Sequence, residues 1–240
     1  MTNGRGWREP KMVRWYHPTQ LLRTGAEVLI AGILGARSDR RLLYGFANLD
    51  PGKEPLPEPS PTGEAVVDYI ADTGDGWNPS YAVAYWASRS LAETSLPVEA
   101  RTPGEVLVLG GDEVYPVASR ASYDARLVQA YETATSFDQS GEARVFALPG
   151  NHDWYDNLVA FSDRFISRGS FARWRCPQSR SYFAVKLPAG WWLLGVDMQL
   201  KNDVDKPQVE YFRQVAAQMA PGDAIVLCLP APLWREYSVE

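Results

Sequence analysis

Residues 105–112 read EVLVLGGD, and this short stretch indicates the class of fold. Four apolar residues at 106–109 are followed by two glycines and an aspartate. An uninterrupted apolar run that ends at glycine is typical of a strand buried on both faces of a parallel sheet. Two comparable runs lie before and after it, EAVVDYIAD at 64–72 and ARVFALPG at 143–150. The sequence therefore predicts three buried strands of one sheet.

Helix-like segments separate these strands. Residues 77–93 predict a helix that Asn78 caps and that has Pro79 in its first turn, where the backbone N–H has no helical partner to lose. Further helices are expected at 122–134 and 155–167. Because strands that alternate with helices of this length form βαβ units, we expect an α/β fold with a parallel sheet and helices on its faces.

The C-terminal third has a different pattern. Residues 181–197, SYFAVKLPAGWWLLGVD, predict two strands joined by a Pro-Ala-Gly turn, as in a hairpin. Asp205 followed by Gln208 predicts a helix that begins with a capping box. The stretch DAIVLCLP at 223–230 predicts one more buried strand, with Cys228 inside it. The expected apolar face of the helix consists of Val209, Phe212, Ala216 and Met219.

The chain divides at a proline-rich segment. The stretch DPGKEPLPEPSPTG at 50–63 contains five prolines, which exclude a helix and favour an extended linker. We therefore expect an N-terminal arm at 1–50, a linker at 51–63 and the main domain at 64–240.

The arm is basic, whereas the rest of the chain is acidic. Residues 1–41 carry eight basic and three acidic residues, a net charge of +5, so the remainder contributes −10 to the total of −5. A basic segment with Trp7, Trp15 and Tyr16 suits a weak contact with an anionic membrane surface. The simpler interpretation is that the arm packs its aromatic side chains on the main domain.

Composition excludes several classes of protein. A chain of 240 residues with 45% hydrophobic residues can bury a core, and a net charge of −5 argues against nucleic-acid binding. No apolar run reaches the roughly 20 residues of a transmembrane helix, and the first residues contain no signal core. Cys176 and Cys228 alone make no disulfide framework. We expect a cytoplasmic protein, with membrane association only through the arm of a full-length form.

Three polar motifs follow the three predicted strands. They are ADTGDG at 71–76, GGDEVYP at 110–116 and PGNHDW at 149–154. Asp72 precedes Asp112 by 40 residues, and Asp112 precedes Asn151 by 39, so each interval holds one strand-helix-strand crossover. The motifs should therefore meet at the carboxyl edge of one sheet, where open α/β sheets bind ligands. Their oxygen-rich side chains, with His152 beside them, suit ions such as manganese, iron or zinc.

In order and spacing, these motifs resemble those of the calcineurin-like metallophosphoesterase superfamily, over roughly residues 64–235. An Asp-x-Gly first motif, and a tyrosine three residues after the second aspartate, are typical of its purple acid phosphatase branch. The chain has DTG at 72–74 and GDEVY at 111–115. The resemblance implies a metallophosphoesterase-like βαβαβ sheet. It also implies a hydrolase of phosphate esters with two divalent or trivalent metal ions, of iron, manganese or zinc.

The resemblance also implies a role for each residue. Asp72 would bind the first metal ion, and Asp112 would bridge the two ions. Tyr115 would bind the first ion as phenolate, and Asn151 would bind the second through its amide oxygen. His152 would not bind metal but would protonate the leaving alkoxide.

The residues themselves leave other roles open. Asp72 and Asp112 also suit helix caps or turns, and Tyr115 also suits a packed aromatic whose hydroxyl is hydrogen-bonded. Asp75 is either a substitute ligand or part of a glycine-rich turn. Asp153 is expected to orient the turn or His152 rather than to bind metal.

The chain departs from the resemblance where further ligands are expected. The family completes its site with about three more histidines, one after a later strand and two in a Gly-His-x-His-like element. Here Pro230 ends the later strand, no such element follows, and His17 lies in the arm. We therefore expect the front part of a longer protein, with an incomplete second sheet, marginal folding and little or no phosphatase activity alone. The alternative is a degenerate, non-catalytic protein of the same fold that binds or scaffolds.

Overall fold

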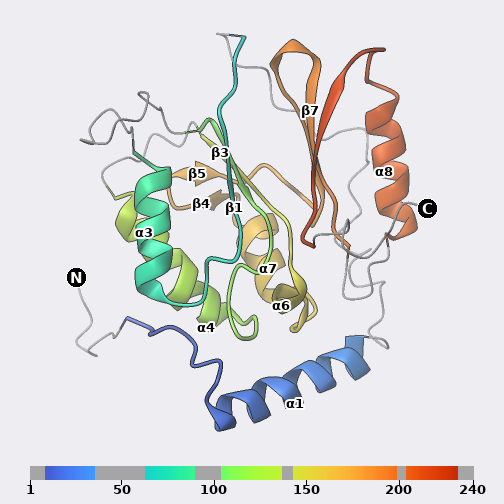
Figure 1. The fold of residues 1–240 in the computed structure, drawn as a ribbon. Helices are drawn as coiled ribbons and strands as arrows, with labels where there is room; N and C mark the ends of the chain where they lie inside the picture. Colours follow the sequence, from blue (N-terminus) through green and yellow to red (C-terminus); the bar gives the residue numbers. More distant parts are fainter. Residues whose placement is uncertain (1–8, 36–62, 90–103, 137–142, 199–203, 232–240) are drawn as a thin grey trace.

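The fold consists of two β-sheets with helices outside them (Figure 1). Residues 1–8 and 36–50 of the arm, and most of the predicted linker, lie outside the residues that the structure describes. The computed structural model describes residues 9–35, 63–89, 104–136, 143–198 and 204–231.

The first sheet contains the three predicted strands as neighbours. β1 (Val67–Ile70), β2 (Val106–Leu109) and β3 (Arg144–Ala147) pair in parallel, in that order. This confirms the predicted parallel sheet. Two short strands that the sequence did not predict extend it, β5 (Trp174–Arg175) parallel to β3, and β4 (Ser170–Phe171) antiparallel to β5. Strands of two residues are too short to produce a hydrophobic period.

Helices follow β1, β2 and β3, as expected. The helix after β1 is α3 (Trp77–Ala87), with Gly76 at its cap position, so the prediction that Asn78 caps it is wrong. Pro79 does lie in its first turn. The helix after β2 is continuous and contains a π-helical stretch; it comprises α4 (Arg120–Ser122), η3 (Tyr123–Val128) and α5 (Gln129–Ala134).

The helical region after β3 begins in two steps. A short helix, α6 (Asn151–Trp154), is followed by α7 (Val159–Phe161) and η4 (Ser162–Ser167). The predicted start at residue 155 is therefore four residues too early, because Leu158 is left-handed at φ 59 and breaks the helix.

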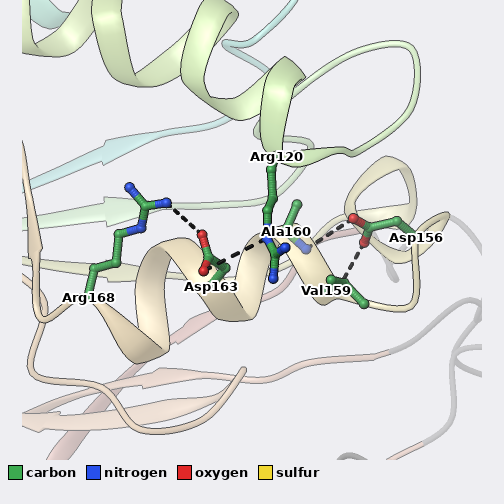
Figure 2. A network of polar contacts seen from close by, with 6 residues as sticks. All are labelled: Arg120, Asp156, Val159, Ala160, Asp163 and Arg168. Carbon is green, nitrogen blue, oxygen red and sulfur yellow. Dashed lines mark hydrogen bonds and ion pairs between the residues drawn. The ribbon is translucent and has the colours of Figure 1, made fainter.

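Polar contacts fix this helical region (Figure 2). The carboxylate of Asp156 accepts hydrogen bonds from the backbone N–H groups of Val159 and Ala160, both at 3.0 Å, and so caps α7. Asp163 pairs with Arg168 at 2.8 Å and lies 3.9 Å from Arg120 of α4. The helices that follow β2 and β3 are therefore linked at the surface.

The two faces of the first sheet are covered differently. Leu107, Leu109, Val145 and Ala147 pack against the helices. The alternate residues Val106, Val108, Phe146 and Leu148 pack against a second sheet. The expected helices therefore cover one face of this sheet, and the strands of the second sheet cover the other.

The second sheet has three strands in the order β6 (Phe183–Lys186), β7 (Trp191–Gly195) and β8 (Ala224–Cys228). β6 and β7 form the predicted antiparallel hairpin around the 3-10 turn η5 (Pro188–Gly190). β8 pairs in parallel with β7 after the crossover helix α8 (Lys206–Ala216). Figure 1 shows α8 on the opposite side of the strands from α3 and α4.

Helix α8 begins as predicted, and Phe212 and Met219 of its expected apolar face pack against the core, but its most buried residues are others. Asp205 accepts a hydrogen bond from the Gln208 backbone N–H at 2.9 Å, which confirms the cap. The Gln208 side chain does not return to Asp205; it donates to the backbone O and accepts from the backbone N–H of Asp197, both at 2.8 Å. The buried face is Gln208, Tyr211 and Val215, and Val209 of the expected apolar face is exposed.

Strand β8 is less buried than its sequence suggests. Ile225, Val226 and Leu227 are exposed, while Cys228 is buried, as expected. The strand lies at the edge of its sheet, so an apolar run did not mean coverage on both faces here.

The described part of the arm runs along the main domain and ends in a helix. The backbone O of Pro10 accepts a hydrogen bond from the Trp77 N–H at 3.0 Å, and Val13 N–H donates to Asp75 Oδ1 at 3.2 Å. The helix that follows, α1 (Pro18–Gly35), lies at the bottom of the view in Figure 1, beyond α4 and α6. In the part of the chain that the structure describes, no helix is long and apolar enough to cross a membrane.

Candidate functional site

Asp72 and Asp112 lie in turns that directly follow β1 and β2. Both residues are left-handed, with φ of 58° and 54°, a conformation that aspartate tolerates better than most residues because its short side chain bonds locally. The Asp72 N–H donates to the Gly111 backbone O at 3.1 Å, so the two turns are joined. The first two predicted motifs therefore meet at the carboxyl edge of the sheet.

Tyr115 connects the two carboxylates. Its hydroxyl lies 2.5 Å from Asp72 Oδ1 and 3.1 Å from Asp112 Oδ2. Burial, and then the hydrogen bond to Asp72, raise the pKa of Tyr115 above its ordinary range. The side chain is therefore a phenol here, and a phenolate would need the positive charge of a bound cation.

Gly150 allows the third motif to approach Asp112. A Cβ on Gly150 would overlap the Asp112 carboxylate and its backbone nitrogen. The next turn then places the His152 N–H 3.0 Å from Asp112 Oδ1. Burial raises the pKa of Asp112, and the hydrogen bond from the His152 backbone lowers it in part. Asp112 is thus the residue on which all three turns converge.

The imidazole of His152 has a defined orientation. Its Nδ1 lies 2.6 Å from the Pro116 backbone O, and because a carbonyl oxygen only accepts, Nδ1 carries the proton. This leaves Nε2 to exchange a proton with a ligand. The ring also packs edge-on against Tyr115, with centroids 4.6 Å apart, and against Tyr155, at 5.0 Å.

Asn151 belongs to the same turn but makes a different contact. Its side chain is exposed, and its Nδ2 donates to the Tyr155 hydroxyl at 2.9 Å. This bond uses the amide nitrogen and leaves the amide oxygen as the candidate ligand atom. Of the five predicted site residues, Asp72, Asp112, Tyr115 and His152 are joined by direct contacts, and Asn151 is joined to them through the chain.

Asp153 supports the site through buried hydrogen bonds. It is fully buried, and its Oδ2 accepts from the backbone N–H groups of Gly150 at 2.9 Å and Glu113 at 3.1 Å. Its Oδ1 accepts from the Tyr123 hydroxyl at 2.5 Å. Burial raises the pKa of Asp153 to about 7. Asp153 therefore orients the turn, as expected, by tying the second motif to the third.

Glu113 is a site residue that the sequence analysis missed. It is fully buried, its Oε1 accepts from the Gly111 N–H at 3.1 Å, and burial followed by the charge of Asp153 raises its pKa well above the ordinary value. Its position between Asp112 and Val114, inside the second motif, was the available signal.

Asp75 serves the N-terminal segment, which we define as residues 9–17. Besides accepting from Val13, it offers its backbone O to Arg126 Nη1 at 2.5 Å, and the same guanidinium nitrogen donates to the Lys11 O at 3.2 Å. These contacts favour a structural role for Asp75 over the role of a metal ligand.

The residues present fit part of a metal centre. Within the described ranges, no group of three or more His, Cys, Asp and Glu side chains could hold a metal ion. Asp72 and Asp112 nevertheless share one hydroxyl donor, Tyr115, so three oxygens converge where one hard or borderline cation could replace the hydroxyl proton. Fewer donors are available for a second ion, for which Asn151 and Asp112 are the candidates among the described residues.

Pro230 lies beside this centre, at the place where the resemblance expects a histidine. A Cβ on Gly111 would lie 3.2 Å from the Cβ of Pro230. Pro230, Asp72 and Asp112 line one cavity of about 580 Å³ that extends between the two sheets to Leu193. His17, the other described histidine, is exposed and its Nδ1 contacts Thr19 Oγ1 at 2.7 Å.

The N-terminal segment forms one side of the site. The ring of Trp15 lies edge-on to Tyr115, with centroids 5.5 Å apart, and to His152, at 5.9 Å. A second cavity, of about 690 Å³, lies between this segment and the β1–α3 region and is lined by Trp15, Asp72 and Tyr115, among others. The simpler interpretation of the arm, that it packs aromatic residues on the main domain, holds for Trp15, whereas Tyr16 is exposed.

Two comparisons with known proteins found no match for this chain. No protein-family model matches the chain, and no curated protein matches it either. The chemistry of the site therefore has to be argued from the arrangement of Asp72, Asp112, Tyr115 and His152 at the edge of the sheet.

Proposed function

We propose that the chain is a metal-dependent hydrolase of phosphate esters, related to the metallophosphoesterases that its motifs resemble. The supporting observation is the convergence of three turns on Asp112, whose carboxylate contacts the Tyr115 hydroxyl and the His152 backbone. Carboxylate and phenol oxygens on one side and an imidazole on the other suit phosphoryl transfer, which asks the protein mainly for positioning and charge stabilisation.

Each residue has a distinct part in the proposed reaction. Asp72, Asp112 and Tyr115 would hold the first metal ion, and Asn151 with Asp112 the second. Bound metal ions would polarise the phosphoryl oxygens and lower the pKa of a coordinated water. As the oxygen of a water molecule bonds to phosphorus and gives up a proton to solvent, the bond to the leaving oxygen would break. A His152 ring protonated on both nitrogens would give its Nε2 proton to the leaving oxygen and keep the proton on Nδ1. The Nδ1 contact to the Pro116 O keeps the ring in the required orientation.

A second candidate is a non-catalytic protein of the same fold that binds phosphorylated molecules or serves as a scaffold. The observation in its favour is Pro230, a side chain without a ligand atom, against Gly111. Within the described residues, no larger acid and histidine cluster compensates for it.

Metal uptake separates the two candidates. The metal-free chain is titrated with Mn²⁺ in a calorimeter, alongside Asp112→Asn, His152→Ala and the surface control Glu210→Gln. The enzyme proposal expects uptake in the unchanged chain, loss in Asp112→Asn, and uptake in His152→Ala and Glu210→Gln. No uptake by the unchanged chain would contradict the enzyme, and two tightly bound ions would contradict the degenerate protein.

Activity is then measured in the full-length protein with an aryl phosphate. His152→Ala and Asp112→Asn are each expected to lower kcat/KM by at least about a hundredfold, since one removes the proton donor and the other the bridging ligand. Glu210→Gln should not change it. Full activity in both site variants would exclude the proposed reaction.

A further inference from the structure

The cavity of about 690 Å³ begins at two residues of the candidate metal centre, Asp72 and Tyr115, and extends away from them along apolar and aromatic side chains. We call it the aromatic pocket. Its other wall residues include Met12, Trp15, Tyr69, Pro79 and Val83.

The wall that contains Trp15 is built into the fold. The N-terminal segment is held by three hydrogen bonds to the main domain, from Trp77 N–H to Pro10 O at 3.0 Å, from Val13 N–H to Asp75 Oδ1 at 3.2 Å, and from Arg126 to Lys11 O at 3.2 Å. These bonds lie on both sides of Met12 in the sequence and end two residues before Trp15.

Trp15 also has a fixed relation to the reacting groups. Its ring is roughly perpendicular to that of Tyr115, at 84°, and to that of His152, at 75°. A phosphoryl group held by the Asp72–Tyr115 side, and protonated on its leaving oxygen by His152, would therefore have the Trp15 ring beside its leaving group.

We propose that the aromatic pocket binds the leaving group of the ester and that this group carries a flat aromatic ring, either a simple aryl ring or the base of a nucleoside. This inference rests on the proposed function and adds the substrate class. Tryptophan and tyrosine side chains favour planar π systems by stacking or edge contacts, and they do so without a hydrogen-bond code. The 580 Å³ cavity on the other side of Asp72 is lined mainly by aliphatic residues, such as Leu193, Val226 and Pro230, and lacks a tryptophan.

Equilibrium binding tests the pocket without requiring turnover. Benzylphosphonate and methylphosphonate, which carry the same headgroup and are not hydrolysed, are titrated into the Mn²⁺-treated chain by calorimetry. The variants are Trp15→Ala, Trp15→Phe and the control Trp191→Ala, an exposed tryptophan of β7 that does not line the pocket.

The unchanged chain is expected to bind benzylphosphonate about tenfold more tightly than methylphosphonate, the size of one aromatic stacking contact. Trp15→Ala should lose this preference, whereas Trp15→Phe and Trp191→Ala should keep it. The affinities for adenosine 5′-monophosphate and ribose 5-phosphate are then compared, to distinguish a nucleobase from a simple aryl group. Tighter binding of adenosine 5′-monophosphate that depends on Trp15 assigns a nucleobase. Equal binding of the two assigns a simple aryl group.

Three results would overturn the pocket: equal affinity of the unchanged chain for the two phosphonates, a preserved preference in Trp15→Ala, or tighter binding of both by Trp15→Ala. The last result would mean that the N-terminal segment shields the site. Each of these can occur while Mn²⁺ uptake still depends on Asp112, so the proposed function would survive. Loss of metal uptake together with a Trp15-dependent preference would reject the metal centre and keep the pocket.

Discussion

The close approach of Gly150 to Asp112 determines which residue can precede the Asn151–His152 turn. Gly150 has φ −84° and ψ −178°, values that any residue can adopt, so backbone conformation does not require glycine there. The requirement is steric, because an added methyl group would overlap the Asp112 carboxylate.

Gly150→Ala is therefore expected to lower the free energy of unfolding by about 1 to 3 kcal/mol, the usual cost of overpacking. It should also weaken Mn²⁺ uptake, since Asp112 must move. Urea unfolding and calorimetry check the two effects. Gly25→Ala is the matched control: nothing lies within 4 Å of its added methyl group, so stability should stay equal or rise. Equal stability of Gly150→Ala and the unchanged chain would contradict the steric argument.

At the same scale, the sequence predicted the residues in contact at the sheet edge but not those that support them. Asp72, Asp112 and His152 could be found because they follow strands at regular intervals. The burial of Glu113 and the place where Trp15 docks could not be predicted in the same way, since both depend on neighbours that are distant in the chain. Asp153 was expected to orient the turn, but its partner Tyr123 lies 30 residues away.

Helix α1 leaves a group of apolar side chains exposed. Leu22 and Leu29 are 77% and 65% exposed, one full heptad apart on the same helix face, and Leu21 lies beside Leu22. Residues 1–41, which contain α1, carry a net charge of +5. An exposed apolar helix face within a basic segment favours binding to the surface of an anionic bilayer.

The chain should therefore sediment with anionic liposomes at low salt and be released at high salt, where surface charges are screened. Leu22→Glu combined with Leu29→Glu should abolish sedimentation. Val159→Glu, which alters an exposed apolar residue of α7, should not. Failure of the unchanged chain to sediment at low salt would leave the basic arm without a membrane role.

The element boundaries also differed from prediction for identifiable reasons. Asp156 caps α7 from within the expected helix, so its start moved to Val159. Gln208, a polar residue on the buried face of α8, bonds to the backbone of Asp197 just after β7, so the buried face includes a residue that hydropathy did not suggest. In both cases a side-chain hydrogen bond outweighed the local pattern.

For the whole molecule, the apolar run at 106–109 correctly predicted that β2 is covered on both faces. It could not distinguish helices from strands as the cover, because either presents aliphatic side chains. The packing of Val108 and Phe146 against Phe183 of the second sheet was consequently missed. Ile225, Val226 and Leu227 of β8 form a similar apolar run, but their side chains are exposed.

Two buried carboxyl groups should make the stability of the whole chain depend on pH. Burial raises the pKa of Asp153 to about 7 and that of Glu113 well above its ordinary value. In the unfolded chain the Asp153 carboxyl group loses its proton near its ordinary pKa of about 3.9. The folded state therefore retains a proton that the unfolded state has lost, and the stability linked to it is present below pH about 4 and disappears as pH rises to about 7.

In metal-free buffer, the free energy of unfolding is expected to fall by roughly 2 to 4 kcal/mol between pH 5 and pH 8. Asp153→Asn should flatten this decline, because it removes one of the titrating groups, whereas the exposed Glu210→Gln should follow the unchanged chain. Urea unfolding across the range measures it. Stability that rises with pH would show that the buried pair is not protonated in the folded state.

The docking of the N-terminal segment has a consequence for how the protein is made. Lys11 leaves the ribosome early, but its partner Arg126 lies 115 residues further along the chain. At ordinary rates of synthesis this separation corresponds to a delay on the order of ten seconds. During that interval Trp15 has neither the Tyr115 ring nor the His152 ring to pack against, so it stays uncovered on the nascent chain. The wall of the site is therefore synthesised before the surface that holds it.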